Sequence, residues 1–441
     1  MATLLTNGSK HEKEASSTST DILTLALDIV QNAASIKTLL ASQHLPAPSF
    51  SPDSAELPDT PEHAALRSRL VAALDDLRLL VVGPRRTMRS LICFSNDLAA
   101  FQVAFEFGFF TIVPESEEGI TLEEVARKAG IDAGRARQVL RMLCTHRVFK
   151  ETKDGWFAHT ASSVAFSRDE NLRCAGHYGM DEMFKAASST ADTIKASPQK
   201  SDLAHSPFKT RLGASMFEYY EQNPEHAARF AKAMAVDRKT STLGDLFPWN
   251  TLHGTVVDVG GGSGHISIAL AHRFPHLTFL VQDGVPDMLA QGRRLLAVED
   301  PAVACRIELL QHDFFQPQPP PERLTTRGPV AAFFLRHVFH NWNDDDAVTI
   351  ARALVPALEA AAPETPLIIS ERVLPCLGDE VPLHEERAMR QMDMMMMVGL
   401  GAKERTLAEW KALFRAADER LEVKKVHGQA ASGILEVVLR K

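Results

Sequence analysis

A glycine-rich turn between an apolar strand and an apolar helix constrains the fold of this 441-residue chain more than any other feature. The segment VVDVGGGSGHISIALA, residues 256–271, passes from a β-branched run into a glycine cluster and then into helical spacing. The cluster consists of Gly260, Gly261, Gly262 and Gly264. Glycines permit positive φ angles and a close approach to a ligand, and the following helix N-terminus offers unpaired N–H groups. The segment therefore predicts a loop for a nucleotide-like cofactor in an α/β sheet.

The spacing of the glycines separates one class of cofactor from another. A dinucleotide-binding turn reads G-x-G-x-x-G, but the sixth position counted from Gly260 is His265. The segment reads instead D-x-G-x-G-x-G, with Asp258 inside the strand. We therefore expect a mononucleoside cofactor, and a purely structural glycine turn is the alternative interpretation.

Charge and cysteine content exclude several classes of protein. The net charge of −8 argues against a nucleic-acid-binding surface as the main function. Five scattered cysteines without a C-x-x-C pair argue against a disulfide framework or a zinc site. The N-terminus lacks a signal-peptide pattern, and we find no stretch of about 18 uncharged apolar residues. We expect a soluble, cytoplasmic protein without a metal.

Composition and periodicity divide the chain into four segments. Residues 1–20 are polar and predict a disordered N-terminus, and residues 21–89 predict amphipathic N-terminal helices. Residues 90–210 predict a winged-helix domain and a linker, with 187–210 as a loop. Residues 211–441 predict the cofactor-binding domain, entered through one helix over 216–234.

The winged-helix pattern of residues 90–166 has two interpretations. Four arginines decorate the helix that would enter a DNA groove: Arg135, Arg137, Arg141 and Arg147. Such a helix reads DNA in many regulators. The same residues also suit the solvated face of a dimerisation module. The negative net charge and the downstream cofactor loop favour the second interpretation.

After the glycine loop the chain alternates strand and helix, as a parallel sheet requires. Strands are predicted at 255–259, 278–282, 306–310, 331–335 and 367–370, and helices at 264–274, 286–298, 344–361 and 406–417. A proline-rich surface loop is predicted over 317–329. Two final strands, 422–426 and 434–439, predict a reversed hairpin at the sheet edge.

Acidic residues at the ends of two strands suit a nucleoside. Asp283 follows Gly260 by 23 residues, and a carboxylate there can accept both ribose hydroxyls. Asp313 can accept from an adenine amine while Phe314 packs on the ring face. A turn aspartate followed by core phenylalanines is the alternative for that second pair.

The segment FLRHVFHNWNDDD, residues 334–346, carries the predicted chemistry. It begins at the end of a strand, where ligands of open α/β sheets bind. His337 lies nearer the strand and is expected to be packed, whereas His340 is placed for proton transfer. A carboxylate on one ring nitrogen would fix the tautomer and raise the basicity of the other, and Glu371 and Glu404 are the candidates. An exposed Glu404 capping its helix is the alternative for that residue.

Four motifs in this order, VDVGGGSG, HDFF, LRHVFHNW and KERT, resemble the class I S-adenosylmethionine-dependent O-methyltransferases of the plant caffeate/flavonoid type. The resemblance covers about residues 90–441 and is strongest to fungal polyketide, or secondary-metabolite, O-methyltransferases. It implies a Rossmann-like, mostly parallel sheet with a C-terminal antiparallel hairpin, preceded by an α-helical winged-helix dimerisation domain. It also implies S-adenosylmethionine as cofactor and a homodimer as the active form.

The resemblance assigns roles to individual residues. His340 becomes the general base, flanked by Glu371 and Glu404. The cofactor is implied to lie among Asp258, Gly260, Gly261, Gly262, Gly264, Asp283, Asp313, Phe314 and Arg336, the last standing where plant members carry lysine. The methionine run 393–401 implies a substrate wall that includes Met394 and Met397. Asn341 departs from the family pattern, which has aspartate after the base.

These assignments predict methyl transfer to a phenolic hydroxyl of a small aromatic substrate, polyketide-derived by resemblance. A non-catalytic winged-helix regulator, or an assembly partner that retains a cofactor pocket, is the alternative. Methylation of nitrogen or carbon on the same fold stays open, because an unprotonated nucleophile needs a base less.

Overall fold

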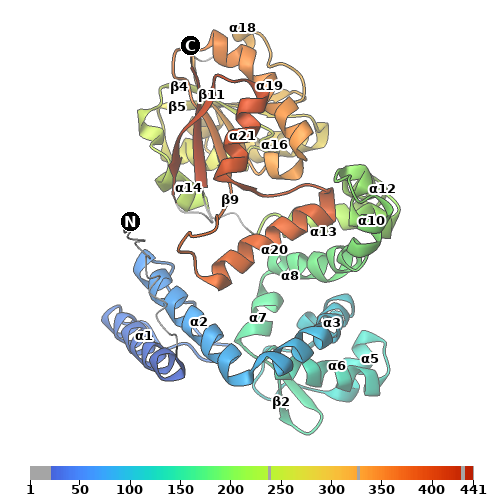
Figure 1. The fold of residues 1–441 in the computed structure, drawn as a ribbon. Helices are drawn as coiled ribbons and strands as arrows, with labels where there is room; N and C mark the ends of the chain where they lie inside the picture. The colour runs from blue at the N-terminus through green and yellow to red at the C-terminus, as the bar shows by residue number, and fades with distance from the viewer. Residues whose placement is uncertain (1–20, 237–239, 325–327, 429–432, 441) are drawn as a thin grey trace, which may run out of the picture. The chain divides into compact units, whose positions relative to one another are not determined.

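The computed structural model describes residues 21–441 apart from 237–239, 325–327, 429–432 and 441. The segment 1–20, predicted to be disordered, lies outside the described residues. The chain divides into two compact units (Figure 1). The first comprises Met1–Pro48 and Ala55–Phe94, and the second comprises Ser49–Ser54 and Ser95–Lys441.

The first unit is a pair of helices, α1 (Ile22–Ser42) and α2 (Pro61–Val82), with the beginning of α3 (Pro84–Glu106). Asp21 caps α1, because its carboxylate accepts hydrogen bonds from the backbone N–H groups of Leu23 and Thr24. Side chains also link the pair, since Arg69 Nε donates to Asn32 Oδ1 at 3.4 Å. The two predicted helices are therefore present and pack on each other.

Helix α1 bears on the expected lack of an uncharged apolar stretch long enough to span a membrane. By length and composition it is apolar enough to cross a membrane, and little of it is buried. The helix has only two charged residues, Asp28 and Lys37. The small residues between its leucines do not lower its mean hydropathy below that of a membrane-spanning helix. A helix of this composition also suits packing against another protein surface.

The second unit begins with the predicted winged-helix pattern. The sheet of three strands has the order β1-β3-β2, and helices α5 and α6 lie beside it. The elements are β1 (Ile120–Thr121), α5 (Leu122–Ala129), α6 (Ala133–Thr145), β2 (Phe149–Lys153) and β3 (Trp156–His159). Gly155 turns the hairpin at φ +72°, as the Asp-Gly pair predicts. A cluster of phenylalanines and leucines from these elements forms the core of the module.

Two of the four arginines singled out in this module are engaged within the protein. Arg141 on α6 makes a two-pronged hydrogen bond with Glu151 and a third with Asp154 of the adjacent hairpin. The guanidinium of Arg147 lies 4.8 Å from the ring centroid of Phe50. Because these cations are paired with groups of their own chain, they support the dimerisation interpretation over DNA binding.

A set of short helices connects this module to the sheet, and it corrects two predictions. The helices are α7 (Ala161–Arg168), α8 (Glu170–Tyr178), the π-helix η1 (Gly179–Met183), α9 (Phe184–Ala187), α10 (Thr190–Ala196), η2 (Leu203–His205), α11 (Pro207–Leu212), α12 (Met216–Gln222) and α13 (Pro224–Ala233). The predicted loop over 187–210 is wrong, since it contains α10 and η2. The single helix over 216–234 is also wrong, because Pro224 cannot continue a helix and instead begins the next one.

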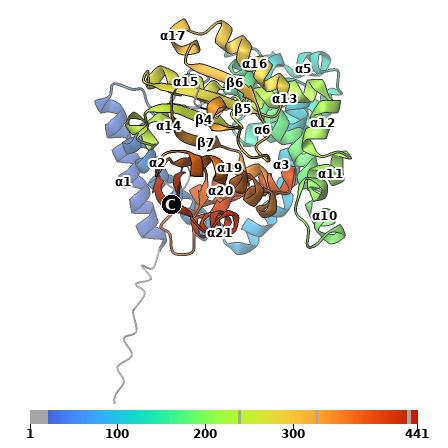
Figure 2. The same cartoon turned by 90° about the horizontal axis from the view of Figure 1, so that it is seen from above.

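The main sheet has seven strands in the order β11-β12-β8-β7-β4-β5-β6 (Figures 1 and 2). The strands are β4 (Gly254–Val259), β5 (Leu277–Asp283), β6 (Ile307–Gln311), β7 (Val330–Arg336), β8 (Leu367–Glu371), β11 (Leu421–His427) and β12 (Gly433–Leu439). Strands β4 to β8 of this sheet run parallel, whereas β12 pairs antiparallel with β8 and β11 antiparallel with β12. The predicted fold class, with its C-terminal reversed hairpin, is confirmed.

Both faces of the sheet are buried, which explains the apolar strands. Alternate residues face opposite layers: Val257 of β4 packs with α19 (Asp344–Ala360) and α21 (Leu407–Ala417), whereas Val256 packs with α14 (Thr240–Leu246) and α15 (His265–Arg273). Figure 2 shows the strands between α15 and α16 (Pro286–Ala297) on one side and α19 and α21 on the other. In the part of the predicted loop 317–329 that the structure describes, residues Pro321–Leu324 form a short helix, α18.

Helix α20 (Leu383–Leu400) leaves the sheet and packs among the connecting helices (Figure 1). It ends at Gly401 with φ +62°, and the chain then returns to the sheet edge. There β10 (Arg405–Thr406) pairs in parallel with β9 (Val373–Leu374), directly after β8. This small pairing places residue 404 beside the carboxyl ends of the parallel strands.

Candidate active site

The glycine loop connects β4 to α15, as predicted, but its glycines have two different structural reasons. Gly260, Gly262 and Gly264 have positive φ angles of 73°, 59° and 77°. Gly261 is not among the residues with positive φ. A Cβ on Gly261 would lie 2.6 Å from the carboxylate of Asp258, so this glycine is required by space. A Cβ on Gly262 would have no neighbour within 4 Å, so the loop is open there.

Asp258 supports this loop from beneath. Its side chain is buried in β4, and Oδ2 accepts a hydrogen bond of 2.6 Å from the Ser267 hydroxyl on α15. Burial raises the pKa of Asp258 to about 6, although Ser267 and Arg336 oppose the shift. The structure therefore gives Asp258 a supporting position under the loop and places Arg336 near it.

The predicted nucleoside-binding acids lie at the same edge. Asp283 ends β5, and its carboxylate accepts from the N–H of Gly262 at 3.0 Å and of Val285 at 2.9 Å. Burial raises the pKa of Asp283. Phe314 lies close to Gly260, since a Cβ there would be 3.5 Å from its ring. Asp313, one residue earlier, accepts from the N–H of Phe315 at 3.0 Å. The loop, both acids and the ring thus share one site.

His340 lies at this edge with both predicted acids beside it. It stands in a 3₁₀ turn, η4 (Phe339–Asn341), after β7. Its Nδ1 is 3.0 Å from Glu404 Oε1 and 3.6 Å from Glu371 Oε2. Among the described residues Nε2 has no hydrogen-bonding partner. Glu404 is only 2% exposed, so the alternative of an exposed helix cap is wrong; Thr406 caps α21 instead.

Glu371 connects the ring to the backbone of its own turn. Oε1 of Glu371 accepts from the N–H groups of Val338 and Phe339, each at 2.9 Å, while Oε2 faces His340. Burial raises the pKa of Glu371, and these hydrogen bonds and His340 act in the opposite direction. One carboxylate therefore positions the turn and polarises the imidazole.

The two acids reverse the effect of burial on the histidine. Burial disfavours the imidazolium, but the charge of Glu371 and the hydrogen bond to Glu404 outweigh it and raise the pKa of His340. Arg372 opposes them, since its guanidinium is 3.6 Å from Glu404 Oε1. A neutral His340 in this setting is a strengthened base whose accessible nitrogen is Nε2.

His337, expected from the sequence to be a packed residue, packs against the base itself. Its ring lies against that of His340, with centroids 5.2 Å apart and planes at 25°. Burial, with the neighbouring Arg336, holds the pKa of His337 well below its usual value. Its backbone has φ +52°, a left-handed conformation that costs a non-glycine residue about 1–2 kcal/mol. Strain of this kind persists where surrounding contacts over-determine it.

Further residues around His340 were missing from the sequence-based set. Arg405 and Arg372 reach its turn and its acid, and Asp393 Oδ1 accepts from the N–H of Glu404 at 2.9 Å. The sequence offered one signal for the two arginines, which is their adjacency to predicted residues. Arg405 follows Glu404 in the KERT motif, and Arg372 follows Glu371. The predicted substrate residues differ in exposure, since Met394 is half exposed and Met397 is partly buried on α20.

Comparisons with known proteins now identify the family. An O-methyltransferase domain matches residues 190–418, and an O-methyltransferase dimerisation domain matches residues 90–169. The chain is 53% identical over its full length, and over the full length of the relative, to O-methyltransferase sol2 of Alternaria solani. The chain belongs to the O-methyltransferase family. It is an S-adenosylmethionine-dependent O-methyltransferase, close to those of fungal secondary metabolism.

Two further comparisons agree with this O-methyltransferase fold. The chlorophenol O-methyltransferase of Trichoderma longibrachiatum is 30% identical, covering 96% of this chain and 90% of the relative. The crystal structure of OxaC superposes with a TM-score of 0.74 at 21% identity, covering 95% of this chain and 99% of the other. Family membership sets aside the alternative of a non-catalytic regulator.

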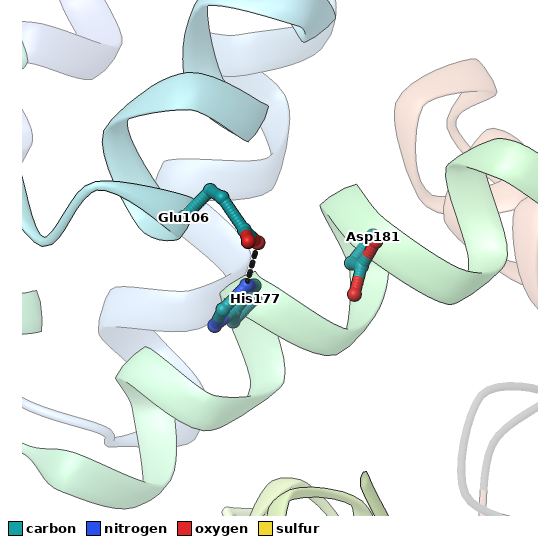
Figure 3. Close-up of side chains that lie close together, drawn as sticks. All are labelled: Glu106, His177 and Asp181. Carbon is teal, nitrogen blue, oxygen red and sulfur yellow. Dashed lines mark hydrogen bonds and ion pairs between the residues drawn. The ribbon is translucent and has the colours of Figure 1, made fainter. Parts of the chain in front are cut away.

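Acid–histidine clusters elsewhere in this O-methyltransferase are internal ion pairs. Figure 3 shows Glu106 Oε2 bound to His177 Nε2, at 3.0 Å, with Asp181 four residues further along. Asp181 pairs with Lys185 and with Arg229, and Glu182 lies 2.8 Å from the same arginine. Because cationic side chains engage these carboxylates, the cluster braces the π-helix η1.

Asn341 binds the carbonyl of His337, the residue with the left-handed backbone. Its Nδ2 donates to the His337 carbonyl at 3.0 Å, which an aspartate carboxylate cannot do. We expect Asn341→Asp to lower the free energy of unfolding by about 1–3 kcal/mol, since it sets two acceptors against each other. Thermal and urea unfolding measure the effect. Asn341→Ala, which lacks the opposing oxygen, should cost less; a wild-type Tm for Asn341→Asp would contradict this role.

Proposed function

We propose that this O-methyltransferase methylates a phenolic hydroxyl of a small aromatic, polyketide-derived metabolite, with His340 as the general base. The observation that carries the proposal is a buried imidazole whose Nδ1 faces two buried carboxylates beside the glycine loop. The protein is further proposed to act in the cytoplasm as a homodimer. Five free cysteines among the described residues support a reducing compartment.

The residues around the loop fit S-adenosylmethionine. The open position at Gly262 leaves space for a ligand, and Asp283 lies against it with carboxylate oxygens for ribose hydroxyls. Asp313 and Phe314 would hold the adenine, and Arg336 would face the cofactor carboxylate. When bound, the cofactor supplies an electrophilic methyl group on a sulfonium. Every proton-transfer task then belongs to side chains of this protein.

His340 is suited to take the acceptor proton as methyl transfer proceeds. A phenol has a pKa of about 10 and imidazole one of about 6.5, so the proton moves only as negative charge develops on oxygen. Nε2 would accept that proton, while Nδ1–H donates to Glu404. The carboxylates of Glu371 and Glu404 stabilise the resulting imidazolium and raise the pKa of His340, which brings it closer to the pKa of the phenol. Such base catalysis contributes about 10²–10⁴ in rate.

The surroundings of the base favour a flat aromatic acceptor. Trp342, two residues after His340, lies 6.5 Å from the ring of Phe217, at an interplanar angle of 29°. Its other contacts are with Phe314 and Phe315. Methionines of α20 form part of the neighbouring apolar cluster and are polarisable, and one relative, at 30% identity, is named for chlorophenol, which is a phenol.

A panel of acceptors tests the reaction itself. The purified protein is incubated with methyl-labelled S-adenosylmethionine and anthraquinones, xanthones, coumarins, flavonoids or chlorophenols. Label transfer to a phenolic oxygen, located by mass spectrometry and NMR, is the expected result. Transfer only to nitrogen or carbon would contradict the proposed acceptor class.

Replacing His340 should separate chemistry from cofactor binding. We expect His340→Gln to lower turnover at least tenfold, since general-base help of about 10²–10⁴ is lost. Cofactor affinity, measured by calorimetry, should stay within about twofold because the loop is untouched. His159→Gln, a buried histidine of the dimerisation domain, is the matched control and should retain turnover. Unchanged methylation by His340→Gln would refute the base assignment.

The acid limb of the pH profile should report His340. Its raised pKa means that the neutral base forms only above about pH 6.5, so kcat/KM should rise with pH through that higher value. Glu404→Gln removes a charge that stabilises the imidazolium, so the limb should move to lower pH. A limb that stays in place, or moves to higher pH, would show that another group titrates.

Exposed apolar side chains support a second copy of the chain as the partner. Helix α3 enters the matched dimerisation domain at residue 90 and exposes Met88, Leu91, Ile92 and Phe94 just there. Helix α1 exposes Ile22, Leu23, Leu27 and Val30. Contiguous apolar surface of this kind marks interaction sites in soluble proteins.

Light scattering tests the dimer. The wild type should have twice the chain mass, and Ile92→Glu should shift it toward the monomer, because a charge would be buried at the interface. Val298→Glu, which changes an 85% exposed residue outside this surface, should stay dimeric. A monomeric wild type would contradict the proposal, and co-sedimentation with lipid vesicles would instead assign the apolar face to a membrane.

A further inference from the structure

Arg405 is a fully buried arginine directly after the acid that holds His340. Its side chain is 0% exposed and ranks among the largest buried side chains of the described residues. Burying a guanidinium is costly unless its donors are satisfied. The use of those donors therefore reveals what the residue does.

All three nitrogens of the Arg405 guanidinium bind the segment that carries His340. NH1 donates to the carbonyl of Phe339 at 3.0 Å, and NH2 donates to the carbonyl of Trp342 at 2.9 Å. Nε donates to Asp344 Oδ1 at 2.9 Å, at the start of α19. The guanidinium thus spans the η4 turn and holds the backbone on both sides of His340.

The neighbours of Arg405 engage the same segment. Lys403 Nζ lies 2.7 Å from Asp344 Oδ2, so this carboxylate is shared between two cations. Glu404 binds the His340 ring itself. Three successive residues of the KERT motif therefore hold the end of the turn, the ring and the backbone. The β9–β10 pairing, with Arg405 opposite Val373, fixes their position relative to β8.

Packing restricts the guanidinium further. It lies 5.4 Å from the Trp410 ring centroid, and that ring packs edge-on against Phe339 at 5.6 Å. The side chain therefore has little freedom to move without displacing the turn. A lysine retains the charge but presents one compact ammonium, which cannot reach both carbonyls as a planar fork does.

We propose that Arg405 is a positioning residue for methyl transfer, which fixes the His340 turn so that Nδ1 meets Glu404 while Nε2 meets the acceptor. Arg405 does not touch substrate or cofactor in this role. The inference rests on the proposed function of His340 as the base. The proposed role of Arg405 depends on the geometry of its guanidinium. A lysine at this position would keep the local charge but would not reproduce that geometry.

Arg405→Lys tests this role with two independent measurements. In ¹⁵N-histidine NMR, with His340 assigned through His340→Gln, we expect its titration midpoint to move toward 6.5 as the contact with Glu404 loosens. The groups that face the ring, Glu371, Glu404, Arg372 and His337, are unchanged in this variant. With the acceptor found in the panel, kcat should fall about 10–100-fold, while KM for S-adenosylmethionine changes less than about twofold.

Arg306→Lys is the matched control. Arg306 also donates to backbone carbonyls, those of Ala271, Leu277 and Ala302. It lies just before β6, at the amino ends of the parallel strands, whereas His340 lies at their carboxyl ends. Arg306→Lys should lower Tm without moving the His340 titration or kcat. Comparison of the two variants separates the general effect of losing an arginine that binds backbone carbonyls from the specific effect of losing one at the His340 turn.

The outcomes distinguish this inference from the proposed reaction. A lowered Tm with wild-type kcat and wild-type His340 titration in Arg405→Lys would overturn the positioning role. If Arg405→Lys does not fold, Asp344→Asn, a change at a half-exposed side chain, should shift the titration in the same direction by less; no shift would overturn the role. If the wild type methylates no acceptor, the proposed function fails while the titration still decides on Arg405.

Discussion

The buried carboxylate of Glu371 is the interaction on which the rest of the site depends. It ends β8, accepts two backbone N–H groups of the turn after β7, and faces the His340 ring. A carboxylate 2% exposed is costly to bury; two hydrogen bonds satisfy Oε1, while Oε2 has only the electrostatic contact with the imidazole at 3.6 Å. Because two adjacent parallel strands are joined here, the turn cannot move without breaking the bonds of a buried charge. The histidine is thereby held before any ligand binds.

This rigid turn is built from strained and compensating parts. His337 has a left-handed backbone and its carbonyl accepts from Asn341, whereas Arg405 donates to the carbonyls of Phe339 and Trp342. These contacts hold the backbone of the turn by hydrogen bonds, and the Phe339 carbonyl accepts a further one from the N–H of Trp342. Asn341 takes part through its amide donor, which a carboxylate at this position would lack.

Much of the fold could be predicted from the sequence because strands buried on both faces and capped helices leave strong local signals. The predicted strand 255–259 differs from β4 by one residue, and the final hairpin is reversed as expected. Errors arose where local signals compete. The Ser- and Lys-rich segment 187–210 forms α10, which packs against α11. The requirement for glycine at position 261 likewise comes from the Asp258 side chain beneath it. Neither contact is visible in residue spacing.

The sequence by itself determined the glycine loop, the order of strands and helices, and the residue types at the carboxyl ends of β5, β7 and β8. These follow from backbone sterics and hydrophobic periodicity, which act over a few residues. Only the tertiary structure decided that Glu404 and Arg405, more than 60 residues after His340, hold its ring and its backbone. The excursion of α20 and the short β9–β10 pairing bring them back to the sheet edge. Such proximity depends on packing between distant segments, for which no local pattern exists.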